Sequence, residues 1–164
     1  MDAVEISPEH VARWQEMADR REIDDVLCRY AWTLDHHDWN VLRDEVFTAD
    51  ATIDFLEYGG LFEGIDAIVA NISRVLGGLD ASQHLIGTSS AEIDGDTATA
   101  RCDRQAQHVL DAAPGDGSQL LFGGTYVDQL VRTAVGWRIK HRTLHPTWVA
   151  GNSEVLSATR EPSA

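Results

Sequence analysis

Residues 82–110 read SQHLIGTSSAEIDGDTATARCDRQAQHVL. Both halves of this segment alternate between apolar and polar residues, as strands with one buried face do. Between them stands Asp94-Gly95-Asp96, a turn signal of the kind that joins two antiparallel strands. The segment therefore predicts a long hairpin with strands over 82–93 and 97–110.

The chain after this hairpin contains two more segments that read as strands. A loop over 111–117 leads to two further strand-like segments, 120–133 and 136–148, joined by a short turn near 134–136. We expect them to form a second antiparallel pair. Residues 151–164 form a tail beyond the core, and its final part, residues 157–164, reads as loose and polar.

The N-terminal part is helical instead. Ser7 followed by Pro8 predicts the start of a first helix, and a second helix runs from Arg20 to the pair His36 and His37. Apolar residues recur at helical spacing in the second helix and predict its buried face: Ile23, Val26, Leu27, Tyr30, Ala31 and Leu34.

The middle of the chain changes period twice. A short helix over 38–46 begins with Asp38 as its cap, and residues 51–55 alternate like a strand. A glycine turn then leads into a helix over 65–76, which Gly77-Gly78 ends.

Helices followed by hairpin-linked strands are typical of an α+β fold. We expect one domain over 1–164, with a core over about 8–150. Its architecture would be a cone-shaped barrel: a strongly curved mixed or antiparallel sheet with the N-terminal helices on its concave face. Such a sheet encloses a conical cavity, which is a natural ligand pocket.

Composition excludes several function classes. The chain of 164 residues has 13 Lys+Arg against 27 Asp+Glu and a formal charge of −14, which disfavours nucleic acid. No long uncharged apolar run predicts a membrane span. The first ten residues lack the features of a signal peptide, and the only two cysteines are Cys28 and Cys102. We expect a reduced, cytoplasmic protein.

Three polar residues of the predicted hairpin attract attention. His84 lies inside one strand, and Arg104 and His108 share one face of the next strand with small and apolar neighbours. A lone inward histidine is most often a core residue with a backbone partner. Two inward histidines and an inward arginine are harder to explain by packing, because buried polar groups cost free energy unless they are paired or used.

An aspartate beside an imidazole gives it a specific chemical role. It accepts the Nδ1 proton, leaves Nε2 free as a base, and raises the histidine pKa above its usual ~6.5. Asp35, near the end of the second helix, is the candidate partner of the strand histidine. Four other aspartates compete on composition alone: Asp24, Asp25, Asp38 and Asp54.

Other motifs predict little chemistry. The glycine pairs lack the context of a phosphate loop, and no GxSxG motif is present. His141 and His145 share a strand face but have no identifiable third ligand, so we expect no metal site. His36 and His37 are explained by the favourable interaction of a cation with a helix C-terminus.

Three segments together resemble a known family. Residues 30–39, YAWTLDHHDW, resemble the opening of the SnoaL-like branch of the nuclear transport factor 2-like superfamily. Residues 83–88, QHLIGT, with a later histidine at 108, resemble scytalone dehydratase. LFGGTY at 121–126 and GWRI at 136–139 resemble hexachlorocyclohexane dehydrochlorinase. The resemblance extends roughly from residue 20 to residue 148.

This resemblance implies a cone-shaped α+β barrel without metal or organic cofactor. It implies an Asp35–His84 pair at the cavity floor as general base, with His108 as a second catalytic histidine. Relatives use this pair for elimination on small hydrophobic, cyclic or polyketide-derived compounds. The resemblance also implies a homo-oligomer, with a trimer favoured and a dimer as the alternative.

The sequence also departs from the dehydratase pattern. Leu34 and Phe55 stand where the dehydratase has tyrosines, so a hydroxyl would have to come from Tyr30 or Tyr58, for which packing roles are equally open. Arg104 replaces an apolar residue and would bind a substrate carboxylate or enolate, or pair with a buried acid. The expected substrate-binding set is Tyr30, Phe55, Tyr58, Arg104 and Trp39.

Three functions follow from this set of residues. The first is a cofactor-independent lyase or isomerase, in which His84 removes a carbon-bound proton while His108 stabilises an oxyanion or protonates the leaving group. The second is a polyketide cyclase of the SnoaL type using the same residues. The third is a non-catalytic ligand-binding protein, in which Trp32, Trp39 and Trp148 line a binding or oligomer surface.

Overall fold

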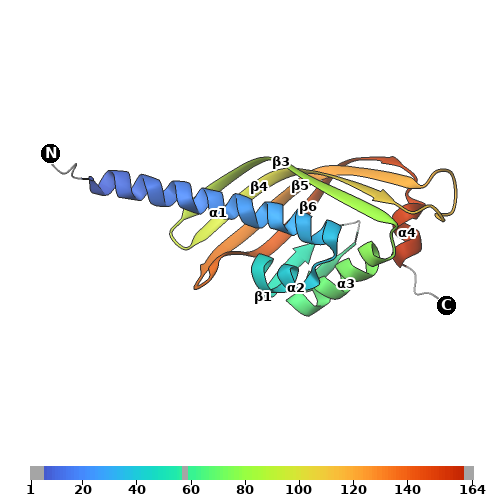
Figure 1. The fold of residues 1–164 in the computed structure, drawn as a ribbon, viewed down its shortest axis with the longest axis horizontal. Coiled ribbons are helices and arrows are strands. Elements are labelled where there is room, and N and C mark those ends of the chain that lie inside the picture. The colour runs from blue at the N-terminus through green and yellow to red at the C-terminus, as the bar shows by residue number, and fades with distance from the viewer. Residues whose placement is uncertain (1–5, 57–58, 161–164) are drawn as a thin grey trace.

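The computed structural model describes residues 6–56 and 59–160 (Figure 1). Its helices and strands follow the predicted order of helices first and long strands later. In chain order the elements are α1 (Pro8–His36), α2 (Trp39–Val41), the π-helical turn η1 (Leu42–Val46), β1 (Phe47–Asp54), β2 (Leu61–Glu63), α3 (Ile65–Gly77), β3 (Ala81–Asp94), β4 (Thr97–Val109), β5 (Gln119–Thr133), β6 (Gly136–Gly151) and α4 (Glu154–Arg160).

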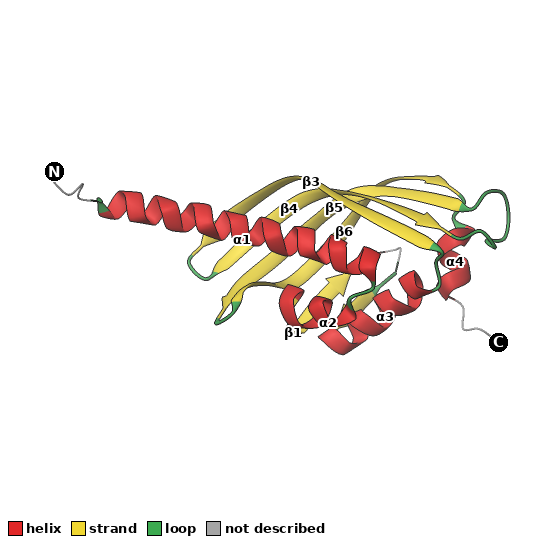
Figure 2. Ribbon diagram, in the orientation of Figure 1, coloured by secondary structure: helices red, strands yellow, loops and turns green. Residues whose placement is uncertain are grey.

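The strands form one mixed sheet of six in the order β2-β1-β6-β5-β4-β3. Strands β3 to β6 are joined as consecutive antiparallel hairpins, whereas β1 pairs with β6 in parallel. The sheet is bent, and α1 and α3 lie on the same side of it (Figure 2). The predicted α+β fold and mixed sheet are confirmed, and the sheet remains open, with β2 and β3 at its edges.

The N-terminal region forms one long helix rather than two. Ser7 caps α1 as predicted, because its hydroxyl accepts the backbone N–H of His10. After Pro8 in the first turn, no glycine or proline interrupts the sequence up to Arg20, so the helix continues through the expected break. Its N-terminal end extends beyond the sheet (Figure 1). The helix ends at His37, whose φ of 55° is left-handed.

Asp19 fastens this long helix to the sheet. Its carboxylate accepts hydrogen bonds from both terminal nitrogens of Arg132, from the Trp137 indole and from Gln15. The side-chain hydrogen bond with Arg132 lowers the pKa of Asp19 to about 2. This buried carboxylate therefore stays charged and holds α1 against the far ends of β5 and β6.

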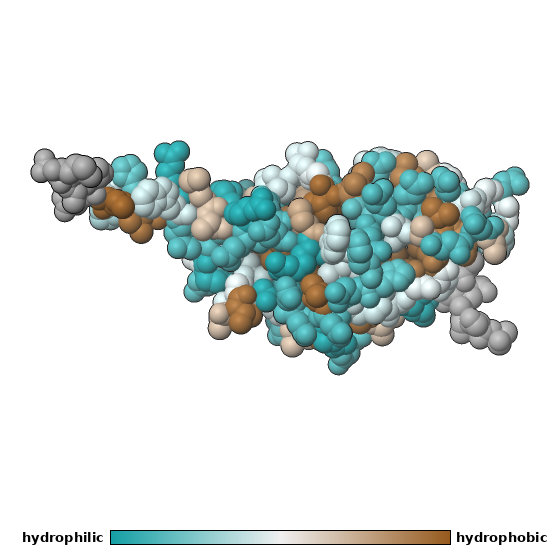
Figure 3. All heavy atoms as spheres, in the orientation of Figure 1, coloured by the Kyte–Doolittle hydropathy of each residue, from teal (hydrophilic) through white to brown (hydrophobic). Residues whose placement is uncertain are grey.

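The core fills the space between the inner sheet face and helices α1 and α3. It contains the predicted apolar face of α1 together with α3 and alternate residues of the strands. On the face shown in Figure 3, hydrophilic residues predominate and apolar ones appear as separate spots, one of them on the protruding end of α1. In the described part of the chain, no helix is both long and apolar enough to span a membrane.

The segment predicted as a loose tail is partly helical. Residues 154–160 form α4, and Val155 is fully buried. The methyl and Cβ of Thr159 lie against Gly78 at the end of α3. The expectation of a polar tail overlooked this contact, because one buried valine in a short segment gives no helical period to recognise.

Candidate active site

The strand register brings three of the predicted site residues onto one inner surface. His84 on β3 lies opposite Ala106 of β4, and Arg104 and His108 flank Ala106 at positions two residues away. Because alternate residues of a strand point to the same side, all three side chains face the interior. His84, Arg104 and His108 are each buried.

Asp35 meets His84 although 49 residues separate them. The His84 imidazole donates from Nδ1 to Oδ1 of Asp35 at 2.7 Å, and the backbone N–H of His84 donates to Oδ2 at 2.8 Å. The Ser82 hydroxyl makes a longer contact of 3.4 Å with Oδ1. Because an ionised carboxylate only accepts hydrogen bonds, the geometry assigns the proton to Nδ1 and leaves Nε2 unprotonated.

Asp35 acts on the pKa of His84 in the expected direction, but the expected net rise of this pKa is wrong. Burial disfavours the charged imidazolium and lowers the pKa of His84 below its usual value. The hydrogen bond with Asp35 acts in the opposite direction, and the positive charge of Arg104 adds to the lowering. His84 is therefore a neutral imidazole at neutral pH, with its base form available.

His108 lies beside His84 in the same hollow. The two rings are 5.6 Å apart between centroids and nearly perpendicular. Burial, together with nearby His84 and Arg104, lowers the pKa of His108 to about 3. A neutral His108 can donate an N–H hydrogen bond, but it is not charged at neutral pH.

This burial makes the stability of the fold depend on His108 below pH 6.5. In the unfolded chain His108 binds a proton near pH 6.5, and in the folded chain it does so only near 3, so acid favours unfolding between these values. From pH 7.5 to pH 5 we expect the wild type to lose about 2 kcal/mol more than His108→Gln. Urea denaturation at the two pH values measures the difference, with the exposed His145→Gln as control. Equal losses in wild type and His108→Gln would contradict the prediction.

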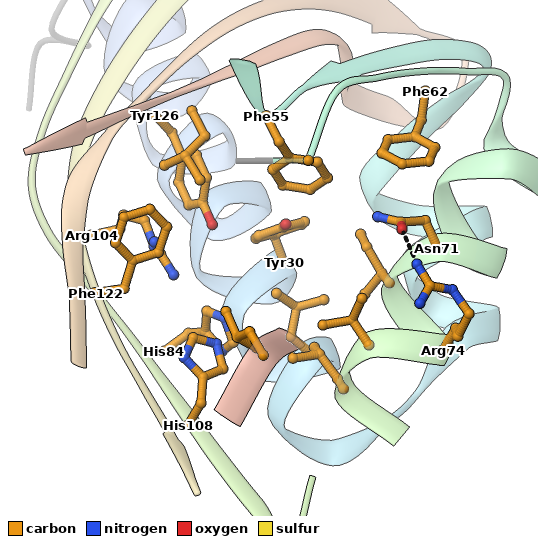
Figure 4. A pocket seen from close by; sticks show the side chains of 17 residues that line it. Tyr30, Phe55, Phe62, Asn71, Arg74, His84, Arg104, His108, Phe122 and Tyr126 are labelled. Carbon is orange, nitrogen blue, oxygen red and sulfur yellow. Dashed lines mark hydrogen bonds between the residues drawn. The ribbon is translucent and has the colours of Figure 1, made fainter. Parts of the chain in front are cut away.

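A cavity of about 250 Å³ opens in front of these residues (Figure 4). His84, Arg104 and His108 lie together on one side of it, and Asn71 and Arg74 lie on the opposite side. Most of the remaining wall is apolar or aromatic. The other lining residues are Tyr30, Leu34, Phe55, Gly59, Phe62, Ile72, Val75, Leu76, Phe122, Tyr126, Leu144 and Leu156.

Of the predicted substrate-binding residues, some line the cavity and others do not. Tyr30, Phe55 and Arg104 line the cavity. Trp39 does not: it packs against the outside of the core and stacks on His37. Because its indole is not among the side chains that line the cavity, the structure does not support the expected contact of Trp39 with substrate. Tyr58 lies outside the described residues.

Tyr30 provides a hydroxyl group in the cavity. Its ring is buried, and burial raises the pKa of this phenol, which therefore stays protonated. The Tyr30 ring packs edge-on against Phe47 and Tyr126. Tyr30 thus has the packing role, and its hydroxyl, which hydrogen bonds with Tyr126, lies at the cavity wall.

Sequence reasoning missed an ion pair behind the cavity wall. Arg142 donates from Nε and Nη2 to the two carboxylate oxygens of Asp128 at 2.7 Å each, and both side chains are fully buried. The Arg142 guanidinium lies 4.0 Å from the ring centroids of Tyr30 and Tyr126. Burial opposes the charge of Arg142, but the Asp128 carboxylate outweighs it and raises the pKa of this guanidinium.

The remaining histidines stay apart from the cavity. The His36 ring contacts the carbonyl of Trp32 at 2.9 Å and stacks on the Trp32 indole, which fits its expected helix-end role. His141 hydrogen bonds with Thr52 on β1 and with Thr143 on its own strand, β6. Within the ranges 6–56 and 59–160, no three metal-ligating side chains of the His, Cys, Asp or Glu type lie together.

The chain is similar to proteins of a known family. The family model for the SnoaL-like domain matches residues 15–143. An uncharacterized protein of Mycobacterium tuberculosis is 39% identical over 128 residues, which cover 77% of this chain and 84% of the relative. The terrestric acid biosynthesis cluster protein E of Penicillium crustosum is 31% identical over 147 residues, with coverage of 85% and 90%.

Solved structures share the architecture. The Kfla4162 protein of Kribbella flavida superposes with a TM-score of 0.79 at 30% identity, covering 87% of this chain and 99% of its own. A protein of Novosphingobium aromaticivorans assigned as a scytalone dehydratase gives 0.73 at 20% identity, with coverage of 82% and 88%. A type 2 hexachlorocyclohexane dehydrochlorinase gives 0.74 at 16%, with coverage of 84% and 91%. The last two likenesses concern the fold alone.

Proposed function

The chain belongs to the SnoaL-like domain family of the nuclear transport factor 2-like superfamily, and on this premise we propose that it is a cofactor-independent lyase or isomerase. The reaction begins with removal of a carbon-bound proton by His84. The substrate is a small, largely hydrophobic ring compound that the aromatic cavity wall surrounds. Assembly as a homotrimer remains a prediction from the family resemblance, and a cytoplasmic location remains a prediction from the composition and N-terminal sequence.

One observation carries this proposal: the 2.7 Å contact between His84 Nδ1 and Asp35 at the edge of a largely apolar cavity. Asp35 holds the ring in one tautomer and one orientation, so Nε2 is the basic atom. Because burial lowers the pKa of His84, this base is unprotonated at neutral pH. As the proton arrives, the Asp35 carboxylate stabilises the resulting imidazolium.

Two neighbouring groups suit the charge that develops on the substrate. His108 is neutral, so it cannot deliver a proton from an imidazolium. Its Nδ1 has no hydrogen-bond partner among the described residues and, in the tautomer that is protonated there, donates to a developing oxyanion. The Tyr30 hydroxyl is protonated and lines the same cavity. In an elimination, the proton taken by His84 leaves one carbon and the leaving group departs from its neighbour. In an isomerisation, the same proton returns at another carbon.

A second candidate is ring closure in biosynthesis. The Penicillium relative is named for a biosynthesis cluster, and a carbanion generated by the same base could attack a carbonyl of the same substrate. Product mass separates isomerisation, which conserves mass, from elimination, which releases water or halide. An aldol closure can do either. The carbon skeleton of the product, read by NMR, then distinguishes closure from elimination.

The proposal is tested by following proton exchange in D₂O. Candidate ring compounds with an acidic C–H bond are incubated with the purified protein, and deuterium uptake is read by NMR. A substrate for the proposed base exchanges one specific C–H position at an enzyme-dependent rate. Compounds that bind in the cavity but show no exchange, elimination or closure would instead support the non-catalytic, ligand-binding function.

The acid side of the pH profile offers a separate prediction. Protonation of His84 removes the base, and its pKa is lowered, so kcat/KM should stay high below pH 6.5 before it falls. The rate of deuterium exchange is measured from pH 4 to pH 8, and the pH at which it falls is compared with the usual histidine pKa of ~6.5. A fall that begins above pH 6.5 would contradict the assignment of His84 as the base.

A further inference from the structure

Arg104 is a buried cation without a polar partner in the cavity wall. Its side chain is 6% exposed, and its Nε and Nη1 atoms find no hydrogen-bond partner among residues 6–56 and 59–160. No carboxylate in those ranges forms an ion pair with it. A buried acid was one of the expected partners of Arg104, but no carboxylate of the described residues pairs with it.

Each of the other two buried arginines of the described chain has polar partners, although Nη1 of Arg142 has none. Arg142 has the Asp128 carboxylate, and Arg138 donates to the backbone carbonyls of Asp44 and Trp137. Arg104 instead stacks on aromatic faces, with its Cζ 4.7 Å from the Phe122 centroid and 5.6 Å from that of Tyr126. Stacking on rings stabilises a cation but leaves its N–H donors unused. A buried unsatisfied donor set of this kind calls for a missing acceptor.

The ionised side chains that line the cavity have one sign, and the Asp35 carboxylate lies behind His84. Among the described lining residues the ionised side chains are Arg74 and Arg104, and none is an acid. His84 and His108 are neutral because their pKa values are lowered. The chain as a whole carries −14, so a positive cavity is contrary to its overall charge. A ligand anion would supply the acceptors that Arg104 lacks.

Arg74 and Arg104 differ in how far they are engaged. Arg74 donates to the carbonyl of Thr159 and to the side chain of Asn71, so protein oxygens already hold it. Arg104 lies instead on the side of the cavity that holds His84 and His108 (Figure 4). An anion bound by Arg104 therefore sits beside the proposed base.

We propose that the ligand of this cavity is a ring compound that bears a carboxylate, and that Arg104 binds the carboxylate. The guanidinium presents parallel N–H donors that match the two oxygens of such a group. The ring would lie among the aromatic side chains of Tyr30, Phe55 and Phe122. The cavity of about 250 Å³, with its aromatic wall, suits a body of one or two rings.

This inference rests on the proposed function only where it calls the ligand a substrate. Arg104 would then be the residue that determines specificity: it holds the anionic end while His84 acts on a carbon of the ring or its substituent. The proton lost from that carbon goes to His84 Nε2. Arg104 stays charged throughout, and no oxidant or further reactant is needed.

Matched acids and amides of the same skeleton test the inference. The probes are benzoate with benzamide and 2-naphthoate with 2-naphthamide, titrated into the purified protein and followed by calorimetry and by the NMR signals of His84 and His108. We expect at least one acid to bind ~10–100-fold more tightly than its amide, as charge-assisted hydrogen bonds imply. Equal binding of acid and amide in both pairs, or no binding of either acid at millimolar concentration, would overturn the inference.

Substitutions locate the preference at one residue. Arg104→Met should abolish the preference for the acid and leave amide binding within a few-fold, and Arg104→Lys should retain part of it. Arg101→Met, on the outer face of the same strand, removes an equal charge outside the cavity and should leave the preference intact. Circular dichroism and melting of each variant establish that it folds. An acid preference that persists in folded Arg104→Met would contradict the assignment.

A further variant separates this inference from the proposed function. His84→Gln removes the base and should still bind the acid with its full preference. If wild type shows the preference but catalyses no exchange of any bound acid, the anion site stands and the lyase proposal fails. If exchange occurs on neutral compounds with no acid preference, the lyase proposal stands and the anion site fails.

Discussion

Replacing His84 by Ala is expected to reduce the rate of substrate deuterium exchange by ~10²–10⁴-fold, because it removes the group that accepts the proton. Asp35→Asn should cause a loss within the same range while leaving the imidazole in place. An asparagine amide can donate to Nδ1 and so favour the tautomer whose Nε2 carries a proton and cannot act as a base. It also removes the carboxylate that stabilises the imidazolium formed during the reaction.

Initial exchange rates of the two single variants and the double variant measure this effect. Because His84 and Asp35 act as a unit, the double variant should be little slower than either single variant. His36→Gln is the matched control, since His36 directly follows Asp35 in the chain but its ring is exposed and contacts the Trp32 carbonyl. Wild-type exchange rates in folded His84→Ala and Asp35→Asn would refute the proposed base.

Asp128→Ala is expected to lower the free energy of unfolding by about 3–5 kcal/mol. The substitution leaves the Arg142 guanidinium charged and fully buried without its carboxylate. Because that guanidinium contacts the rings of Tyr30 and Tyr126, its displacement should also disturb the floor of the cavity. Urea denaturation, with the unfolding free energy extrapolated to water, measures the loss.

The double variant Asp128→Val with Arg142→Met should recover most of this stability, since a methionine packs well between aromatic rings and no charge remains buried. Asp25→Ala is the control: its partner Arg21 is 77% exposed, and loss of this surface pair should cost less than about 1 kcal/mol. A loss from Asp128→Ala that is as small as the loss from Asp25→Ala would show that water or another group replaces the carboxylate.

Much of the fold follows from local signals in the chain. Alternation over 82–93 and 97–110, with Gly95 at the turn between them, predicts β3 and β4 to within a residue or two because period and turn chemistry agree. The predicted break between two helices at Arg20 was wrong, because a polar segment without glycine or proline contains no signal that ends a helix. Helix α4 depends on contacts with distant residues, which sequence periodicity does not report.

The candidate site divides in the same way. Alternation placed His84, Arg104 and His108 on inner faces, but the partner of His84 came from the family resemblance, since spacing alone leaves five aspartates open. Arg142 escaped notice because β6 is irregular between Ile139 and His141, which reverses the alternation beyond that point. The missing partner of Arg104 and the lowered pKa of His84 depend on burial, which only the assembled structure provides.

The parallel pairing of β1 with β6 has a consequence for how the protein is made. Ile53 pairs with Arg142, so a strand near residue 50 waits for one that the ribosome releases about 90 residues later. Until β6 is made, β1 and its short neighbour β2 cannot pair with the rest of the sheet. The apolar faces of α1 and α3 meanwhile have no complete sheet to pack against. Such long-range closure slows folding, so the nascent chain should depend on chaperone protection late in synthesis.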